Sequence, residues 1–201
     1  MGQSEYRKQF LKIFDSIGRH HNHYERFADF LELATCAIRK TTVPPGPETD
    51  AFEARYMKTV ARYPPDDVRT MPKLLALIQL AVGHGGCDFL GDIAGELEVL
   101  DAKLGQLITP YPLSRLIAEI TLEGAGAIIA ERGFITLQEP ASGAGGMIIA
   151  AADVVEKKGF DPSSTLYVGA RCGVTLFQDD LSAALASRHP RHRPPRQYAL
   201  A

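Results

Sequence analysis

The sequence predicts an α/β chain in which a helical N-terminal domain (1–100) precedes the first part of an α/β domain (101–172). Apolar residues recur at helical spacing through the first hundred residues, which favours helices there. A short apolar run, 134–137, then leads through an acidic residue and a glycine-rich loop into a second apolar run that opens at residue 147. A strand, a glycine loop and a helix in that order are typical of the open parallel sheets that bind nucleotide-type cofactors.

Two stripes of aromatic and aliphatic residues predict the first two helices. The first stripe comprises Tyr6, Phe10, Ile13, Phe14 and Ile17, and the second comprises Tyr24, Phe27, Phe30, Leu31 and Ile38. We interpret both stripes as core and not as a surface that stacks on bases. His20, His21 and His23 lie between the stripes and do not share one helical face, so we interpret them as a junction between helices and not as a metal site.

Proline-rich breaks divide the rest of the helical domain, because proline cannot continue a helix from within. The break at 42–47 is followed by a helix centred on Tyr56. The break at 64–65 is followed by a strongly apolar helix that ends near Gly83. We expect a further short helix from Asp88, after which the α/β domain begins.

The candidate ligand-binding residues lie in the loop after the strand predicted at 134–137. It comprises Glu139, Pro140, Ala141, Ser142, Gly143, Ala144, Gly145 and Gly146. Glycine allows sharp turns and a close approach of the backbone to a ligand, and an acid at the carboxyl end of a strand lies where open α/β sheets bind ligands. Because a carboxylate repels a pyrophosphate but attracts an ammonium group, the loop favours a ligand such as S-adenosylmethionine. A glycine turn without a ligand is the alternative.

The composition restricts the binding partners and the cellular compartment that we expect for this protein. The net charge of −2 provides no general basic field for a phosphate backbone, so DNA affinity requires a local patch or a further module. No apolar run is long enough to span a bilayer and no secretory signal opens the chain, so we expect no membrane partner. Cys36, Cys87 and Cys172 lack C-x-x-C spacing, which favours reduced thiols in a cytoplasm over disulfides or zinc.

The glycine loop resembles motif I of the N-6 adenine DNA methyltransferases, the family that includes type I modification subunits. In that motif an acidic residue, a proline and two further residues precede G-x-G-G, and here Ser142 stands where cysteine is common. A second match lies upstream, where Gly105-Gln106 and Thr109-Pro110 are similar to the family's Gly-Gln-aromatic-aromatic-Thr-Pro motif, although Leu107-Ile108 replaces the aromatic pair. A third match, 88–98, looks like the helix that leads into that motif.

The resemblance is strongest to stand-alone methylases found on mobile elements, and it covers residues from about 6 to about 168. It implies a Rossmann-like sheet and a cytoplasmic DNA adenine-N6 methyltransferase that uses S-adenosylmethionine, with DNA as partner. In the intact family, the amine of a flipped adenine attacks the sulfonium methyl group. The implied cofactor site comprises Thr109, Pro110, Glu139, Pro140, Ala141, Ser142, Gly143, Gly145 and Gly146.

The chain departs from the family pattern in two places. After the strand predicted at 166–168, the family has an acid that binds the cofactor ribose, whereas residues 169–173 contain no carboxylate. A charge-assisted hydrogen bond contributes about 1.5–3 kcal/mol, so its loss predicts roughly ten- to a hundredfold weaker cofactor binding. The Asn/Asp-Pro-Pro-aromatic motif that orients the adenine amine is absent, so we assign no catalytic residue.

Three hypotheses for the function stay open. The chain is a catalytically incomplete fragment of a DNA adenine-N6 methyltransferase, a cofactor- or partner-binding remnant without turnover, or a methyltransferase for a small molecule or protein. The pairing of Gly105-Gln106 with Thr109-Pro110 favours DNA over the third hypothesis.

The tail, 173–201, changes in character. It is basic and rich in proline around 189–196, which predicts disorder. Codons compatible with Leu176 to Leu200 include a second-frame translation that resembles the family's continuation, so we hypothesise a frameshift there. A parallel sheet cut short at this point has an unpaired edge, which predicts self-association.

Overall fold

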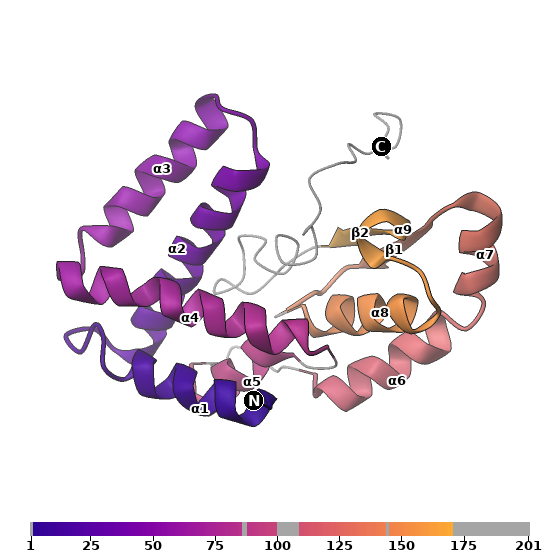
Figure 1. The fold of residues 1–201 in the computed structure, drawn as a ribbon, viewed down its shortest axis with the longest axis horizontal. Helices are drawn as coiled ribbons and strands as arrows, with labels where there is room; N and C mark the ends of the chain where they lie inside the picture. The colour runs from indigo at the N-terminus through magenta and orange to yellow at the C-terminus, as the bar shows by residue number, and fades with distance from the viewer. Residues whose placement is uncertain (1, 86–87, 100–108, 144, 171–201) are drawn as a thin grey trace.

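The computed structural model describes residues 2–85, 88–99, 109–143 and 145–170. Within these residues, nine helices accompany one two-stranded parallel sheet (Figure 1). The described chain is therefore mostly helical and closes with an α/β unit, which agrees with the predicted class at this level.

Five helices form the first part of the chain. They are α1 (Gln3–Phe14), α2 (His23–Thr42), α3 (Pro47–Val60), α4 (Pro65–Gly83) and α5 (Phe89–Glu96). Prolines occupy the first position of α3 and α4, where no intrahelical donor is lost, so both predicted breaks are confirmed as helix boundaries. The start of α2 is fixed by reciprocal hydrogen bonds between Asn22 and Glu25, which form a capping box. The three histidines lie at this junction between α1 and α2, as expected.

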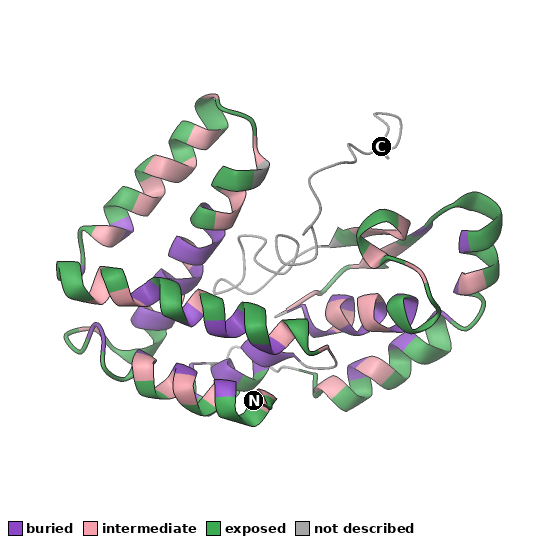
Figure 2. Ribbon diagram, viewed as in Figure 1, coloured by how far each residue is buried: buried purple, intermediate pink, exposed green. Residues whose placement is uncertain are grey.

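The aromatic stripes form the core of the helical part. Phe10 is fully buried and meets Phe30 and Phe89 edge to face, with ring centroids 5.6 and 5.9 Å apart. Such pairs stabilise a core beyond the area they bury. Tyr24 is an exception to the predicted stripe: it is 41% exposed, because it lies in the first turn of α2 beyond the packed face. Figure 2 shows the buried residues of α1, α2, α4 and α5 turned toward one another.

The second part of the chain holds the sheet. Its elements are α6 (Tyr111–Thr121), α7 (Ala125–Arg132), β1 (Ile135–Glu139), α8 (Gly146–Lys157), α9 (Pro162–Thr165) and β2 (Leu166–Ala170). The two strands pair in parallel, from Ile135 opposite Leu166 to Glu139 opposite Ala170. Both strands and the helix after the glycine loop were predicted, whereas α7 and α9 were not. A second cluster of buried apolar side chains joins α6, α7 and α8 to β1.

Two separate clusters of buried apolar side chains therefore organise the described chain. The first runs from Tyr6 to Val99 and the second from Ala118 to Val155. The domain boundary predicted near residue 100 lies at 100–108, outside the described residues, as do Cys87, Cys172 and the tail.

Candidate cofactor site

The glycine loop connects the carboxyl end of β1 to the amino end of α8. Gly143 and Gly145 have φ values of +53° and +87°, in the left-handed region that side chains disfavour. The N–H of Gly145 donates to the carbonyl of Ser142 at 2.7 Å, which closes the turn. The predicted strand, acid, glycine turn and helix are thus present in that order.

Glu139 ends β1 and folds back over its own loop. Its Oε1 accepts the backbone N–H of Ala141 at 3.0 Å, while Pro140 and Ala141 are exposed. The acid therefore stabilises the turn that leaves the strand. Its carboxylate is half-buried, so it lies where a ligand over the loop can meet it.

Two of the loop glycines have different surroundings. A side chain at Gly143 would meet nothing within 4 Å, so its backbone borders open space. A side chain at Gly146 would lie 2.8 Å from Oδ2 of Asp88 and 3.6 Å from Oγ of Ser114. Gly143 can accommodate a ligand, whereas the side-chain position of Gly146 is already occupied by the protein. The absence of a side chain at Gly146 has a packing reason that the sequence did not reveal.

Asp88 is a buried acid that sequence reasoning placed on a helix but not in the site. It is 2% exposed, and its Oδ1 caps α5 by accepting the N–H of Gly91 at 2.9 Å. Its Oδ2 has no hydrogen-bond partner among the described residues, and neither does Oγ of Ser114, a fully buried residue of α6. Burial raises the pKa of Asp88 to about 6, the Gly91 hydrogen bond lowers it and the neighbouring Asp92 raises it.

The first turn of α6 lies against α8, which brings the two predicted motifs together. The Ser114 N–H donates to the carbonyl of Pro110 at 3.1 Å, so Ser114 links the Thr109-Pro110 end of α6 to Gly146. The hydroxyl of Tyr111 donates to Asp153 of α8. Asp153 is half-buried. Thr109 and Pro110 are exposed, and residues 105–108 lie outside the described residues.

The end of β2 lies beside the end of β1, at the position where the family has an acid. Gly169 lies opposite Gln138, whose Oε1 is 2.8 Å from where a Gly169 side chain would begin. A larger residue at 169 would require only the end of the exposed Gln138 side chain to move. Residues 171–173 lie outside the described residues.

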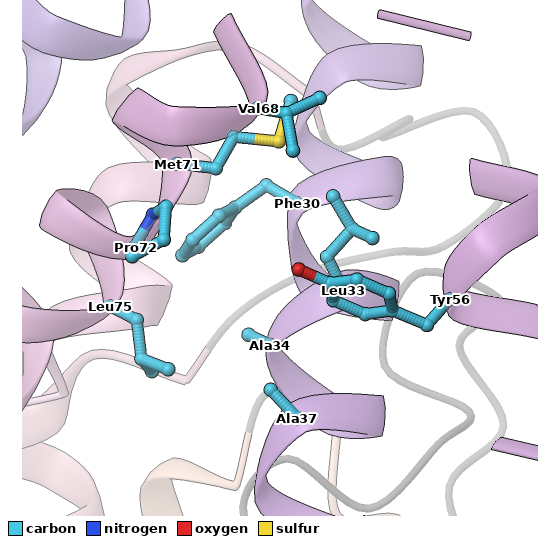
Figure 3. Close-up of a pocket in the computed structure, with 9 residues that line it drawn as sticks. All are labelled: Phe30, Leu33, Ala34, Ala37, Tyr56, Val68, Met71, Pro72 and Leu75. Atoms are coloured by element: carbon cyan, nitrogen blue, oxygen red, sulfur yellow. The ribbon is translucent and has the colours of Figure 1, made fainter. Parts of the chain in front are cut away.

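A separate apolar cavity lies in the helical part. It has a volume of about 80 Å³ between α2, α3 and α4 (Figure 3). Its lining comprises Phe30, Leu33, Ala34, Ala37, Tyr56, Val68, Met71, Pro72 and Leu75. Pro72 lies inside α4, where it cannot donate a hydrogen bond to the preceding turn. Apart from the Tyr56 hydroxyl the lining offers no side-chain group for chemistry, so we do not place the site there.

The described residues have no helix with both the length and the apolar character to cross a bilayer. In the same residues, no three His, Cys, Asp or Glu side chains gather as metal ligands would. Comparisons with models of protein families, with characterised proteins and with solved structures found no match.

Proposed function

We propose that the chain holds the S-adenosylmethionine site of an adenine-N6 DNA methyltransferase. The observation that carries the proposal is the unit formed by β1, the glycine loop and α8, with a half-buried carboxylate at the strand end and open space beside Gly143. Open parallel sheets bind ligands at this edge. The contact between Ser114 and Gly146 adds support, because it joins the segment that contains Thr109 and Pro110 to the same loop.

The proposed roles follow from the chemistry of each group. The turn around Gly143 lets the backbone approach the ligand, and Glu139 attracts its positive charge. Pro140, Ala141 and Ser142 shape the turn before Gly143, and Gly145 gives the left-handed residue at which α8 begins. Thr109 and Pro110 border the ligand from the start of α6.

Cofactor binding without turnover is the favoured form of this function. The sequence lacks the Asn/Asp-Pro-Pro-aromatic motif that orients the adenine amine in the resembling family. A cytoplasmic binding protein is therefore the favoured candidate, an active methyltransferase is the second, and DNA is the proposed partner. Transfer of a labelled methyl group from S-adenosylmethionine to DNA separates the two: we expect binding and no transfer, and measurable transfer would favour the enzyme.

A matched pair of glycine variants tests the cofactor site. Gly143→Ala and Gly133→Ala both force an alanine into the left-handed region, since Gly133 has a φ of +84°, and neither side chain would meet a neighbour within 4 Å. Each should lose about 1–2 kcal/mol of stability. Calorimetric titration with S-adenosylmethionine should show at least tenfold weaker binding for Gly143→Ala alone. Equal affinities for the two variants, or no binding by the unchanged chain, would refute the proposal.

A second pair tests the charge at the strand end. Glu139→Gln keeps an oxygen for the Ala141 N–H but removes the charge, and should weaken binding roughly tenfold. Glu131→Gln, on the exposed face of α7, is the control and should bind as the unchanged chain does.

A further inference from the structure

The apolar cavity of the helical part has a buried floor and an accessible rim. The floor consists of buried side chains of α2 and α4, namely Phe30, Leu33, Ala34 and Met71. The rim consists of half-buried or exposed residues of all three helices, namely Ala37, Tyr56, Val68, Pro72 and Leu75. The cavity is therefore a preformed pocket that a molecule in solution can enter (Figure 3).

The size and polarity of the cavity select its content. A buried water occupies about 10–15 Å³ of such a volume and needs roughly two to four polar partners. The cavity of about 80 Å³ has room for several waters, but Tyr56 supplies its only polar side-chain group. Because an engineered apolar cavity of about 150 Å³ holds benzene, this smaller one suits an aliphatic group of about four carbons.

Two hydrogen-bonding groups lie in the wall of this otherwise apolar cavity. The Tyr56 hydroxyl points from α3 toward the lining residues of α2 and α4 (Figure 3), and it makes no hydrogen bond to the residues that the structure describes. The second group is the carbonyl of Val68, which lacks its usual helical donor because Pro72 has no N–H. Val68 and Pro72 are four residues apart, so this carbonyl lies on the face of α4 that lines the cavity.

We propose that this cavity is a binding site for a small aliphatic alcohol. The hydrocarbon part of the ligand fills the floor between Phe30 and Met71, where apolar surface is removed from water. The ligand hydroxyl donates to the Val68 carbonyl and accepts the Tyr56 O–H, so both polar groups of the wall gain a partner. The site belongs to the helical part, and its occupation does not depend on the cofactor site.

The methionines of the chain report on the cavity in a methyl NMR titration with isobutanol. Met71 lines the floor, whereas Met57 is 53% exposed on α3 and Met147 lies in α8. Isobutanol should shift the Met71 methyl signal to saturation and leave the other two signals in place. The dissociation constant should be on the order of 1 mM, because a ligand of about five heavy atoms has a limited affinity.

Two variants with matched controls test the floor and the hydroxyl partner. Ala34→Leu fills the floor and should abolish the Met71 shift, whereas Ala54→Leu, on the exposed face of α3, should not change it. Tyr56→Phe removes one hydrogen bond and should weaken isobutanol binding roughly two- to tenfold. The same variant should bind isobutyl chloride, which has the same carbon skeleton and no hydroxyl, as the unchanged chain does. Tyr24→Phe, at an exposed tyrosine, is its control.

Each result decides for or against the alcohol site. A Met71 signal that does not shift, or equal shifts of all three methionine signals, overturns the proposal. So does a Met71 shift that persists in Ala34→Leu, or a Tyr56→Phe variant that binds both probes equally more weakly. Circular dichroism melts show whether each variant folds, and Ala37→Leu, at the rim, gives the same readout if Ala34→Leu does not fold.

Discussion

Replacing Asp88 by Asn should stabilise the ligand-free protein above neutral pH. The amide keeps an oxygen for the Gly91 N–H, and Asn caps helices as well as Asp does, so the start of α5 is unchanged. The substitution removes the charge and places an amide NH2 group where the unpartnered Oδ2 lies, so the cost of that buried donor reduces the gain. A gain in stability from a polar substitution at a buried site is unusual, because most substitutions there destabilise.

The pKa of Asp88 sets the size and the sign of the effect. Burial raises it from the usual 3.8 to about 6, and at about 1.4 kcal/mol for each pH unit this interval corresponds to about 3 kcal/mol. Well below pH 3.8 the acid is protonated in both states and costs nothing. As pH rises to about 6 the unfolded chain loses its proton first, so stability falls over this window and stays low above it. The amino end of α8 offsets up to ~2 kcal/mol, which leaves a gain of about 1–3 kcal/mol for the Asn variant.

Urea unfolding at pH 4 and pH 7.5 measures this difference. The chain contains no tryptophan, so helical circular dichroism is the suitable signal. We expect the stabilities of Asp88→Asn and the unchanged chain to differ through this charge by no more than about 0.6 kcal/mol at pH 4, and we expect the full gain at pH 7.5. Asp50→Asn, an exposed acid in the first turn of α3, is the control and should change stability by less than about 0.5 kcal/mol at either pH. A variant that loses stability at pH 7.5, or gains equally at both pH values, would refute the reasoning.

Three further predictions concern the described fold. Arg26→Met should lower the free energy of unfolding in urea by about 2–4 kcal/mol, because the buried Nη1 donates to two backbone carbonyls at 3.1 and 2.9 Å. The control Arg69→Met, at an exposed arginine, should lower it by less than about 0.5 kcal/mol. Tyr63→Phe should cost about 1.5–3 kcal/mol, because the hydroxyl donates to the buried Asp29 at 2.6 Å. Burial and then this hydrogen bond raise the pKa of Tyr63, so the stabilisation is present below about pH 10 and is lost at higher pH. The chain should self-associate through its short sheet, as measured by sedimentation velocity. Thr136→Lys, on the exposed face of β1, should reduce this association. A monomer at every concentration would contradict the prediction.

Periodic signals explain what the sequence predicted well. The aromatic spacing of α1 and α2 repeats over several turns, and the burial of Phe10 and Phe27 follows from it. The strands were predicted because glycine or proline bounds each short apolar run. The helix α7 was not predicted, because its apolar residues are consecutive: Ile129 is buried while Ile128 is 42% exposed, so no amphipathic contrast marks the packed face.

The site was predictable only where its residues are neighbours in the chain. Glu139, the turn at Gly143 and the helix start at Gly145 form one continuous segment, and local rules suffice for them. The contact of Asp88 with Gly146 joins segments far apart in sequence, and its only local sign is the cap that Asp88 makes on Gly91. Whether a side-chain oxygen has a partner depends on tertiary packing, which no spacing records.

The contrast between the two buried aspartates argues for a ligand at the junction. Asp29, in the helical core, is paired through both oxygens, with Arg62 at 2.5 Å and Tyr63 at 2.6 Å, as a purely structural acid should be. Asp88 is as deeply buried but uses one oxygen, and the groups around the other are a hydroxyl without a partner in the described residues and an uncapped helix start. An apolar residue at 114 would remove the unpaired hydroxyl, whereas at 88 it would also remove the cap on α5. Residues that lower stability and have no structural compensation are expected at sites where a ligand supplies the compensation. The glycine loop, which ends at Gly146, is where this chain has its other features of a ligand site.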